Sequence, residues 1–432
     1  MNWIFDLLIP LFGVVLPMLG VGLVVRTLLK KTGDVGLFLF YGAGIHVVLQ
    51  TLFSWVGVSI TMSQIVLIIV GYIGLFYALW RNRTRFHKKM FFVPMLVVLI
   101  TLPFFIRTFS VTMYTWDSVA FWMPKMYALT QKPTARVENF TYFNHPEYPL
   151  FVPMIAANTY SLFRDGEIHE AAAKVSLFAF VPFWIYAMYT GFRKFGIHPV
   201  GAFLSLFTFL MLFVVRDHIS GEYAGTADLF IGLYAGLGML LLLLKRPFHA
   251  VAMFLFLPWI KTEGLVWFGA AAACIGLLVL YKKEWKNLLK LIAFFAIGTT
   301  WYWYTKMSGD TSQYGKFSEI YARPWAEYAA YAIHSFREQF RLLNKWGMLW
   351  YAWILSFGTQ LKRVTANWHI FIPLFLIFTQ LISYLVIFTI TPEEQATFIS
   401  ASISRLSLHL APSAFGMMMY LLCTKEKGKD SA

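Results

Sequence analysis

Isolated acids and isolated cations that interrupt apolar segments are the residues of this sequence best suited to do chemistry. The first of the acids is Asp117, which stands among aromatic residues just after the apolar segment 90–106. A carboxylate there could act as a general base or bind a metal ion, and it could instead cap the helix that follows. Because an acid beside so long an apolar segment is costly, we expect Asp117 to have a function.

Two cations stand in similarly apolar surroundings. Lys261 lies in a short turn with Glu263, within an apolar run, and Arg405 opens the last apolar segment. A lysine acts on a phosphate as a point charge, and an arginine offers two donor edges, so both suit a phosphate at the lipid boundary. The alternatives are a purely structural turn for Lys261 and Glu263, and an Arg405 that only reaches toward the membrane surface.

A proline-flanked segment supplies three further candidates, His145, Glu147 and Tyr148. They occur in the sequence Asn-His-Pro-Glu-Tyr-Pro. The two prolines hold the chain extended, which would present these side chains at fixed positions. The alternative interpretation is a structured loop that leads into the next helix.

Four other residues are further polar or aromatic candidates. Asp228 lies about one turn inside an apolar segment, where it is either near a helix N-terminus or, as we favour, beside a water-filled cavity. Trp116 and Trp122 flank Asp117 and could belong to the aromatic belt of a membrane protein. Lys125 follows on the same segment as a further polar candidate.

The composition predicts an all-α polytopic membrane protein. Of the 432 residues, 59% are hydrophobic and only 13% are charged, and the mean hydropathy is +0.63. The net charge of +15 comes from short basic clusters between apolar segments, which is typical of cytoplasmic anchors and argues against nucleic acid as a partner. The two cysteines, Cys274 and Cys423, both lie in apolar segments and predict neither a disulfide nor a metal site.

The spacing of apolar segments predicts about thirteen transmembrane helices in a plasma or inner membrane. With the N-terminus outside as a retained first helix and the C-terminus in the cytoplasm, the basic clusters between the spans fall on one side. The segment 148–163 would reverse this pattern if it crossed, so we predict an interfacial or re-entrant helix on the outer face. The predicted spans are 7–29, 35–57, 62–80, 90–107, 171–192, 199–215, 226–244, 248–260, 264–281, 289–306, 345–361, 369–390 and 405–423.

In these residues the chain resembles the C-type membrane-integral glycosyltransferases, which include the aminoarabinose transferase of lipid A and the protein O-mannosyltransferases. The resemblance covers about residues 90–290, with a weaker match at Arg405. The sequence departs from the family pattern by having a single acid in the first loop, and Glu147 and Glu263 at places where relatives carry lysine. The matching positions are Asp117, Tyr148-Pro149-Leu150, the segment 162–172, Asp228, the turn from Lys261 to Gly264, and Arg405.

The resemblance implies a core with outer-face loop helices over residues 90–424, preceded by additional helices in 1–89 and followed by a cytoplasmic tail at 425–432. Its outer loops would be 107–170 and 306–344. It further implies a polyprenyl-phosphate sugar donor within the membrane lipids, a glycan, lipid or protein acceptor, and an inverting single displacement at the outer face.

In this reaction Asp117 would be the base, and Lys261 and Arg405 would bind the donor phosphate. The two tryptophans could stack on sugar faces. The residues that would position the sugar or the acceptor are His145, Glu147, Tyr148, Asp228, Glu263, Trp116, Trp122 and Lys125. We expect no cofactor; a metal ion between carboxylates is the alternative. Two other functions stay open: a polymerase or ligase that uses lipid-linked oligosaccharides, and a lipid or solute transporter.

Overall fold

The computed structural model describes residues 3–29, 36–82, 89–113, 115–131, 134–143, 145–163, 169–308, 325–390 and 395–424, and every regular element in these ranges is helical. The predicted loop 306–344 and tail 425–432 therefore lie partly or wholly outside the described residues. In chain order the elements are α1 Trp3–Pro10, η1 Leu11–Val15, α2 Leu16–Leu29, α3 Gly36–Trp55, α4 Ile60–Asn82, α5 Lys89–Ser110, η2 Ser118–Trp122, α6 Met123–Gln131, η3 Val137–Asn139, α7 Phe151–Tyr160, α8 Glu170–Phe178, α9 Phe180–Lys194, α10 Pro199–Met211, α11 Phe213–Ser220, α12 Ala227–Leu243, α13 Pro247–Phe254, α14 Leu257–Ile260, α15 Gly264–Tyr281, α16 Trp285–Met307, α17 Trp325–Arg341, α18 Leu343–Trp346, α19 Leu349–Gly358, α20 Leu361–Ala366, α21 Trp368–Ile390 and α22 Gln395–Cys423.

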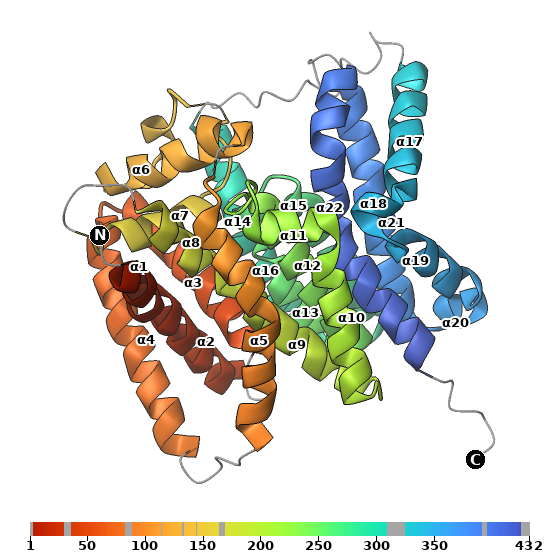
Figure 1. The fold of residues 1–432 in the computed structure, drawn as a ribbon, viewed down its shortest axis with the longest axis horizontal. Helices are drawn as coiled ribbons and strands as arrows, with labels where there is room; N and C mark the ends of the chain where they lie inside the picture. The colour runs from red at the N-terminus through yellow and green to blue at the C-terminus, as the bar shows by residue number, and fades with distance from the viewer. Residues whose placement is uncertain are drawn as a thin grey trace.

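The helices form three groups in space. In Figure 1, α1 to α4 make up one side of the molecule, α12 lies near the centre, and α17 to α21 make up the other side, with α22 between them and the centre. Helices α6 and α7 lie toward the top of this view, whereas the C-terminal ends of α4 and α22 lie toward the bottom. The last turn of α4 carries Arg81, so a basic helix end and the C-terminal end of α22 share one side.

Among the described residues, eight helical segments are long and apolar enough to cross a membrane, and a ninth results if α10 and α11, which meet at 78°, form one broken span. The prediction of an all-α chain with many apolar helices is confirmed at this level. The eight segments are Trp3–Val25, Gly36–Trp55, Ile60–Arg81, Phe92–Ser110, Glu170–Lys194, Gly264–Tyr281, Trp368–Thr389 and Ser402–Cys423.

The remaining predicted spans also coincide with helices, but these helices meet the requirements less well. Helix α12, the α13–α14 pair and α19 are apolar but shorter than a bilayer core requires. Helix α16 is long enough, yet its second half is rich in threonine, tryptophan and tyrosine. The count of thirteen spans thus stays a prediction.

Helix α7 occupies the middle of the segment that was predicted to lie at the interface. All ten of its residues are buried, and it packs against α6 and α8. An interfacial helix exposes one face to lipid or water, so the burial of α7 argues against the interfacial alternative, while a re-entrant helix stays a prediction.

The close contact between α12 and α22 positions most of the candidate site. Gly232 and Gly236 lie one and two turns after Asp228, on the same face of α12. A Cβ atom at Gly232 would lie 2.9 Å from the carbonyl oxygen of Leu408, and one at Gly236 would lie 2.8 Å from Pro412 Cβ. Small residues therefore let the two backbones approach, and this approach brings Asp228 against the N-terminal half of α22.

A tight break between α14 and α15 positions the second element of the site. Pro258 stands in the first turn of α14, and Lys261 follows in an extended conformation. Gly264 begins α15 so close to the carbonyl group of Leu257 that an added Cβ would lie 2.3 Å from its oxygen. Only glycine fits there, and the resulting sharp turn directs Lys261 toward α12.

Candidate functional site

Asp117 does not cap a helix with its side chain. Its backbone is already helical and its carboxyl group makes no capping hydrogen bond. The hydroxyl of Thr115 takes that role by accepting a hydrogen bond from the amide of Ser118 at 3.4 Å. The carboxyl group of Asp117 instead forms an ion pair with Nη1 of Arg405, 288 positions later in the chain.

Asp228 is the centre of the polar contacts. Its Oδ1 atom accepts hydrogen bonds from Lys261 Nζ at 2.8 Å and from His409 Nε2 at 2.9 Å. Its Oδ2 atom lies 3.9 Å from Nη1 of Arg405. Asp228 is fully buried, so the acid is surrounded by cations and an imidazole rather than by the water-filled cavity that we had favoured. It is also the second residue of α12, where the positive end of the helix favours a negative charge.

Glu263 and Tyr384 make the remaining polar contacts at this site. Nζ of Lys261 lies 3.2 Å from Oε1 of Glu263, which places the lysine between two carboxyl groups. The hydroxyl of Tyr384, on α21, lies 2.5 Å from Nδ1 of His409. We refer to the six residues Asp117, Asp228, Lys261, Glu263, Arg405 and His409 as the charged cluster.

The members of the charged cluster differ in how far a ligand could reach them. The side chains of Asp117 and Arg405 are each 15% exposed, whereas those of Asp228 and Lys261 are 1% and 8% exposed. Asp117 and Arg405 thus form the accessible edge, and the other residues lie behind it. Three carboxyl groups face two permanent cations, so an incoming anion would have to displace a carboxyl group.

The segment from His145 to Tyr148 borders the charged cluster. The ring of Tyr148 lies 5.9 Å from Nζ of Lys261 and stacks on the His145 ring at 4.5 Å. Nδ1 of His145 lies 3.2 Å from Oε1 of Glu147. The backbone of His145 has a φ of 54°, a left-handed conformation that histidine adopts uncommonly.

Lys125, on α6, holds this segment and is completely buried. Its Nζ atom donates hydrogen bonds to the carbonyl oxygens of His145, Pro146 and Tyr148, at 2.5, 3.3 and 3.1 Å. The remaining carbonyl oxygen in the segment, that of Glu147, accepts one from Trp301 Nε1 at 2.8 Å. Lys125 therefore positions the segment and does not itself reach a substrate.

The two tryptophans beside Asp117 lie in opposite environments. Trp116 is 66% exposed and presents an aromatic face outward. Trp122 is 1% exposed and packs against Phe121 and Tyr148, so its rings are not open to a sugar in this structure.

His409 and Tyr384 belong to the site but were not among the predicted residues. The sequence does indicate His409, because it follows Arg405 by four residues and therefore lies on the same face of α22. Tyr384 had no such signal, since it is one of 22 tyrosines and lies in an apolar segment.

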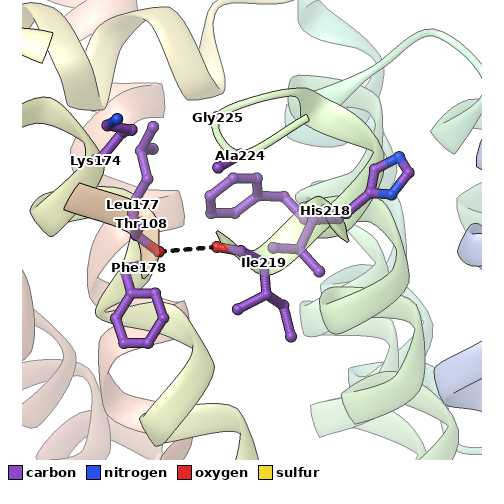
Figure 2. A pocket seen from close by; sticks show the side chains of 10 residues that line it. Thr108, Lys174, Leu177, Phe178, His218, Ile219, Ala224 and Gly225 are labelled. Carbon is purple, nitrogen blue, oxygen red and sulfur yellow. Dashed lines mark hydrogen bonds between the residues drawn. The ribbon is translucent and has the colours of Figure 1, made fainter. Parts of the chain in front are cut away.

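A small pocket lies between this site and α5, and Figure 2 shows its lining. Thr108 donates a hydrogen bond across it to the carbonyl oxygen of Ile219 at 3.4 Å, and the His218 ring points away from it. Its volume of about 10 Å³ is at the lower limit for one water molecule, so it is no substrate site. In the described part of the chain, no group of three or more His, Cys, Asp or Glu side chains could hold a metal ion.

Comparison with known protein families, with curated proteins and with solved structures finds no match for this chain. The chemistry of the site must therefore be argued from its own geometry.

Proposed function

We propose that the protein is a membrane glycosyltransferase that moves a sugar from a polyprenyl-phosphate donor to an acceptor hydroxyl at the outer face of the membrane. The observation that carries the proposal is the contact between Asp117 and Arg405 at the accessible edge of the charged cluster. A carboxylate next to a guanidinium supplies both a base for an acceptor hydroxyl and a ligand for a phosphate leaving group.

The proposed reaction is a single displacement at the anomeric carbon. The acceptor oxygen forms a bond to this carbon while the bond from the carbon to the donor phosphate oxygen breaks. The proton of the acceptor passes to Asp117, and the polyprenyl phosphate leaves with the bonding electron pair. Arg405 stabilises the charge that develops on this phosphate, and the configuration at the anomeric carbon is inverted.

Arg405 is the principal phosphate ligand in this proposal, and Lys261 has a supporting role. Lys261 is fixed between Asp228 and Glu263, whereas Arg405 meets Asp117 at the edge that a ligand can reach. The donor phosphate therefore competes with Asp117 for Arg405. Binding of the donor would release the carboxylate for the acceptor, so donor binding precedes acceptor activation.

The replacement Asp117→Asn tests both halves of this proposal. We expect transfer to fall by roughly 10²- to 10⁴-fold, the range that a general base contributes. We also expect tighter binding of undecaprenyl phosphate, because asparagine competes less for Arg405. The assay is consumption of undecaprenyl phosphate that carries glucose, galactose or N-acetylglucosamine by purified protein, together with a direct binding measurement.

Asp217→Asn is the matched control, since Asp217 is an acid outside the cluster that pairs with Arg107 at 3.7 Å. It should leave transfer and binding close to the wild type. Full transfer by Asp117→Asn would overturn the assignment of the base. Wild-type protein that binds no undecaprenyl-phosphate sugar would overturn the proposed function as a whole.

A further inference from the structure

A second polar site is lined by residues directly next to those that border the charged cluster. It is a cavity of about 50 Å³ between the proline-flanked segment, the turn after α14 and the last turns of α16. Its polar lining includes Glu147, Thr262, Thr305 and Lys306. None of these four residues belongs to the charged cluster.

Glu147 is the feature that points to a ligand. Its side chain is 8% exposed, and its Oε1 atom is engaged by His145. The Oε2 atom is buried and has no hydrogen-bond partner among the described residues. A buried polar atom left in this state is destabilising, and a donor group from a ligand would remove that cost.

The orientation of Glu147 is fixed by its surroundings. All four carbonyl oxygens of residues 145–148 accept hydrogen bonds from Lys125 or Trp301. Trp301 also lines the cavity, so the residue that holds the backbone of Glu147 forms part of the wall. The carboxyl group is therefore presented by a rigid segment, which is what selective recognition of a ligand requires.

The lining of the cavity identifies the kind of group that it would accept. Pro149, Pro258 and Trp301 provide apolar walls, and the Thr305 hydroxyl, which donates to the carbonyl oxygen of Tyr302 at 2.9 Å, can still accept a hydrogen bond. A ligand here must offer hydrogen-bond donors next to carbon-bound hydrogens. The volume suits a few water molecules or one small substituent, and it is too small for a whole sugar ring.

The cavity lies close enough to the charged cluster to contact a donor substrate bound there. Glu147 precedes Tyr148, whose ring lies 5.9 Å from Nζ of Lys261, and Thr262 follows Lys261 directly. Both walls are thus continuous with residues at the charged cluster. A sugar whose phosphate lies at Arg405 could place one substituent into this cavity.

We propose that the cavity at Glu147 is a specificity subsite that receives a hydroxyl- or ammonium-bearing substituent of the transferred sugar. The proposal rests on the function proposed above. Glu147 accepts a hydrogen bond from the substituent through Oε2, and Thr305 accepts a second one. The subsite selects among donors and takes no part in the displacement itself.

The test compares donors that differ in one substituent. Undecaprenyl-phosphate hexose that the wild type consumes is assayed beside its singly deoxygenated and amino-substituted analogues, and kcat/KM is measured for each. We expect one deoxygenated analogue to lose about 10- to 100-fold, the effect of one or two hydrogen bonds to a buried acceptor. In Glu147→Gln and in Thr305→Val this discrimination should shrink, while binding of undecaprenyl phosphate without a sugar stays unchanged.

Glu138→Gln is the matched control, because Glu138 is an exposed acid of the same loop region. It should keep the wild-type preference. An equal loss for all donors and for the sugar-free lipid in both variants would show a merely structural role and overturn the subsite alone. Unchanged discrimination in both variants would do the same. Wild-type protein that consumes none of the donors would overturn the proposed function, and the subsite with it.

Discussion

Two buried polar networks in this protein are built on different principles. One is the charged cluster around Asp228, and the other is a neutral network in which Gln50 and Asn158 exchange hydrogen bonds at 2.8 and 2.7 Å. Gln64 and Ser161 extend the neutral network, with Gln64 donating to the backbone of Asn158 at 2.7 Å. It joins α3 and α4 to α7 without any charge.

The difference lies in what each network leaves unsatisfied. No side-chain oxygen or nitrogen of Gln50, Gln64 or Asn158 is buried without a hydrogen bond. In the charged cluster, Oδ2 of Asp228 and Oε2 of Glu263 have none. A closed network of neutral amides specifies how helices fit together, whereas an open network of charges retains capacity for a ligand. The comparison teaches that these two buried polar networks differ in whether their buried oxygens all have donors.

The largest effect should follow from Asp228→Leu, which breaks the charged cluster at its centre. Lys261 and His409 would lose their shared partner in a buried environment, and such a loss destabilises by about 3–5 kcal/mol. We expect a clear fall of the thermal unfolding midpoint in detergent and no transfer. Asp228→Asn, which keeps the shape, should recover much of the stability but not the transfer. A stable, active Asp228→Leu protein would remove the distinction between the two networks.

A smaller effect should follow from Gln50→Leu in the neutral network. The side chain of Asn158 would be left without its amide partner, at a cost of about 1–3 kcal/mol. The double variant Gln50→Leu/Asn158→Leu should regain part of this loss, because both polar groups are then absent. Thermal unfolding of the two variants measures the difference. Transfer per folded molecule should match the wild type, and a selective loss of transfer would give this network a functional role.

The smallest effect should follow from Glu338→Gln on α17. Glu338 pairs with Arg341 at 3.1 Å, but both side chains are about half exposed. Water and salt screen such a pair, so its removal should not shift the unfolding midpoint measurably. Arg81→Gln, at the end of α4, serves as a second exposed control. A large shift for Glu338→Gln alone would show that charge matters here irrespective of burial.

The sequence made Asp117, Lys261 and Arg405 recognisable because each is a charged residue in an apolar context. The sequence does not predict that Asp228 contacts these residues, because the contact depends on the packing of α12 against α22. The glycines that permit the contact follow Asp228 at intervals of four. This spacing predicts a close helix contact, but it does not identify the helix that makes it. Helices nearly 200 positions apart pair through tertiary packing, which the local sequence pattern does not reveal.

The number of spans was harder to predict than the presence of helices. Apolar length identifies segments that could cross, but the short α13 and α14 and the buried α7 are equally apolar. An internal helix and a lipid-facing helix have the same composition when neighbouring helices take the place of lipid. The burial of Trp122 and Lys125 likewise depends on the segment folded over them.

Pro412 has a consequence for how the N-terminal half of α22 can move. Proline carries no amide hydrogen, so the carbonyl group of Leu408 one turn earlier has no donor within the helix and faces Gly232 instead. The helix therefore lacks one backbone hydrogen bond just after His409, and a helix bends most readily at such a point. His409 and Arg405 both lie before this point, and α22 is held at this point by its contact with α12. If the part of α22 before Pro412 tilted, the guanidinium of Arg405 would move away from Asp117, while Lys261 and Asp228 kept their positions.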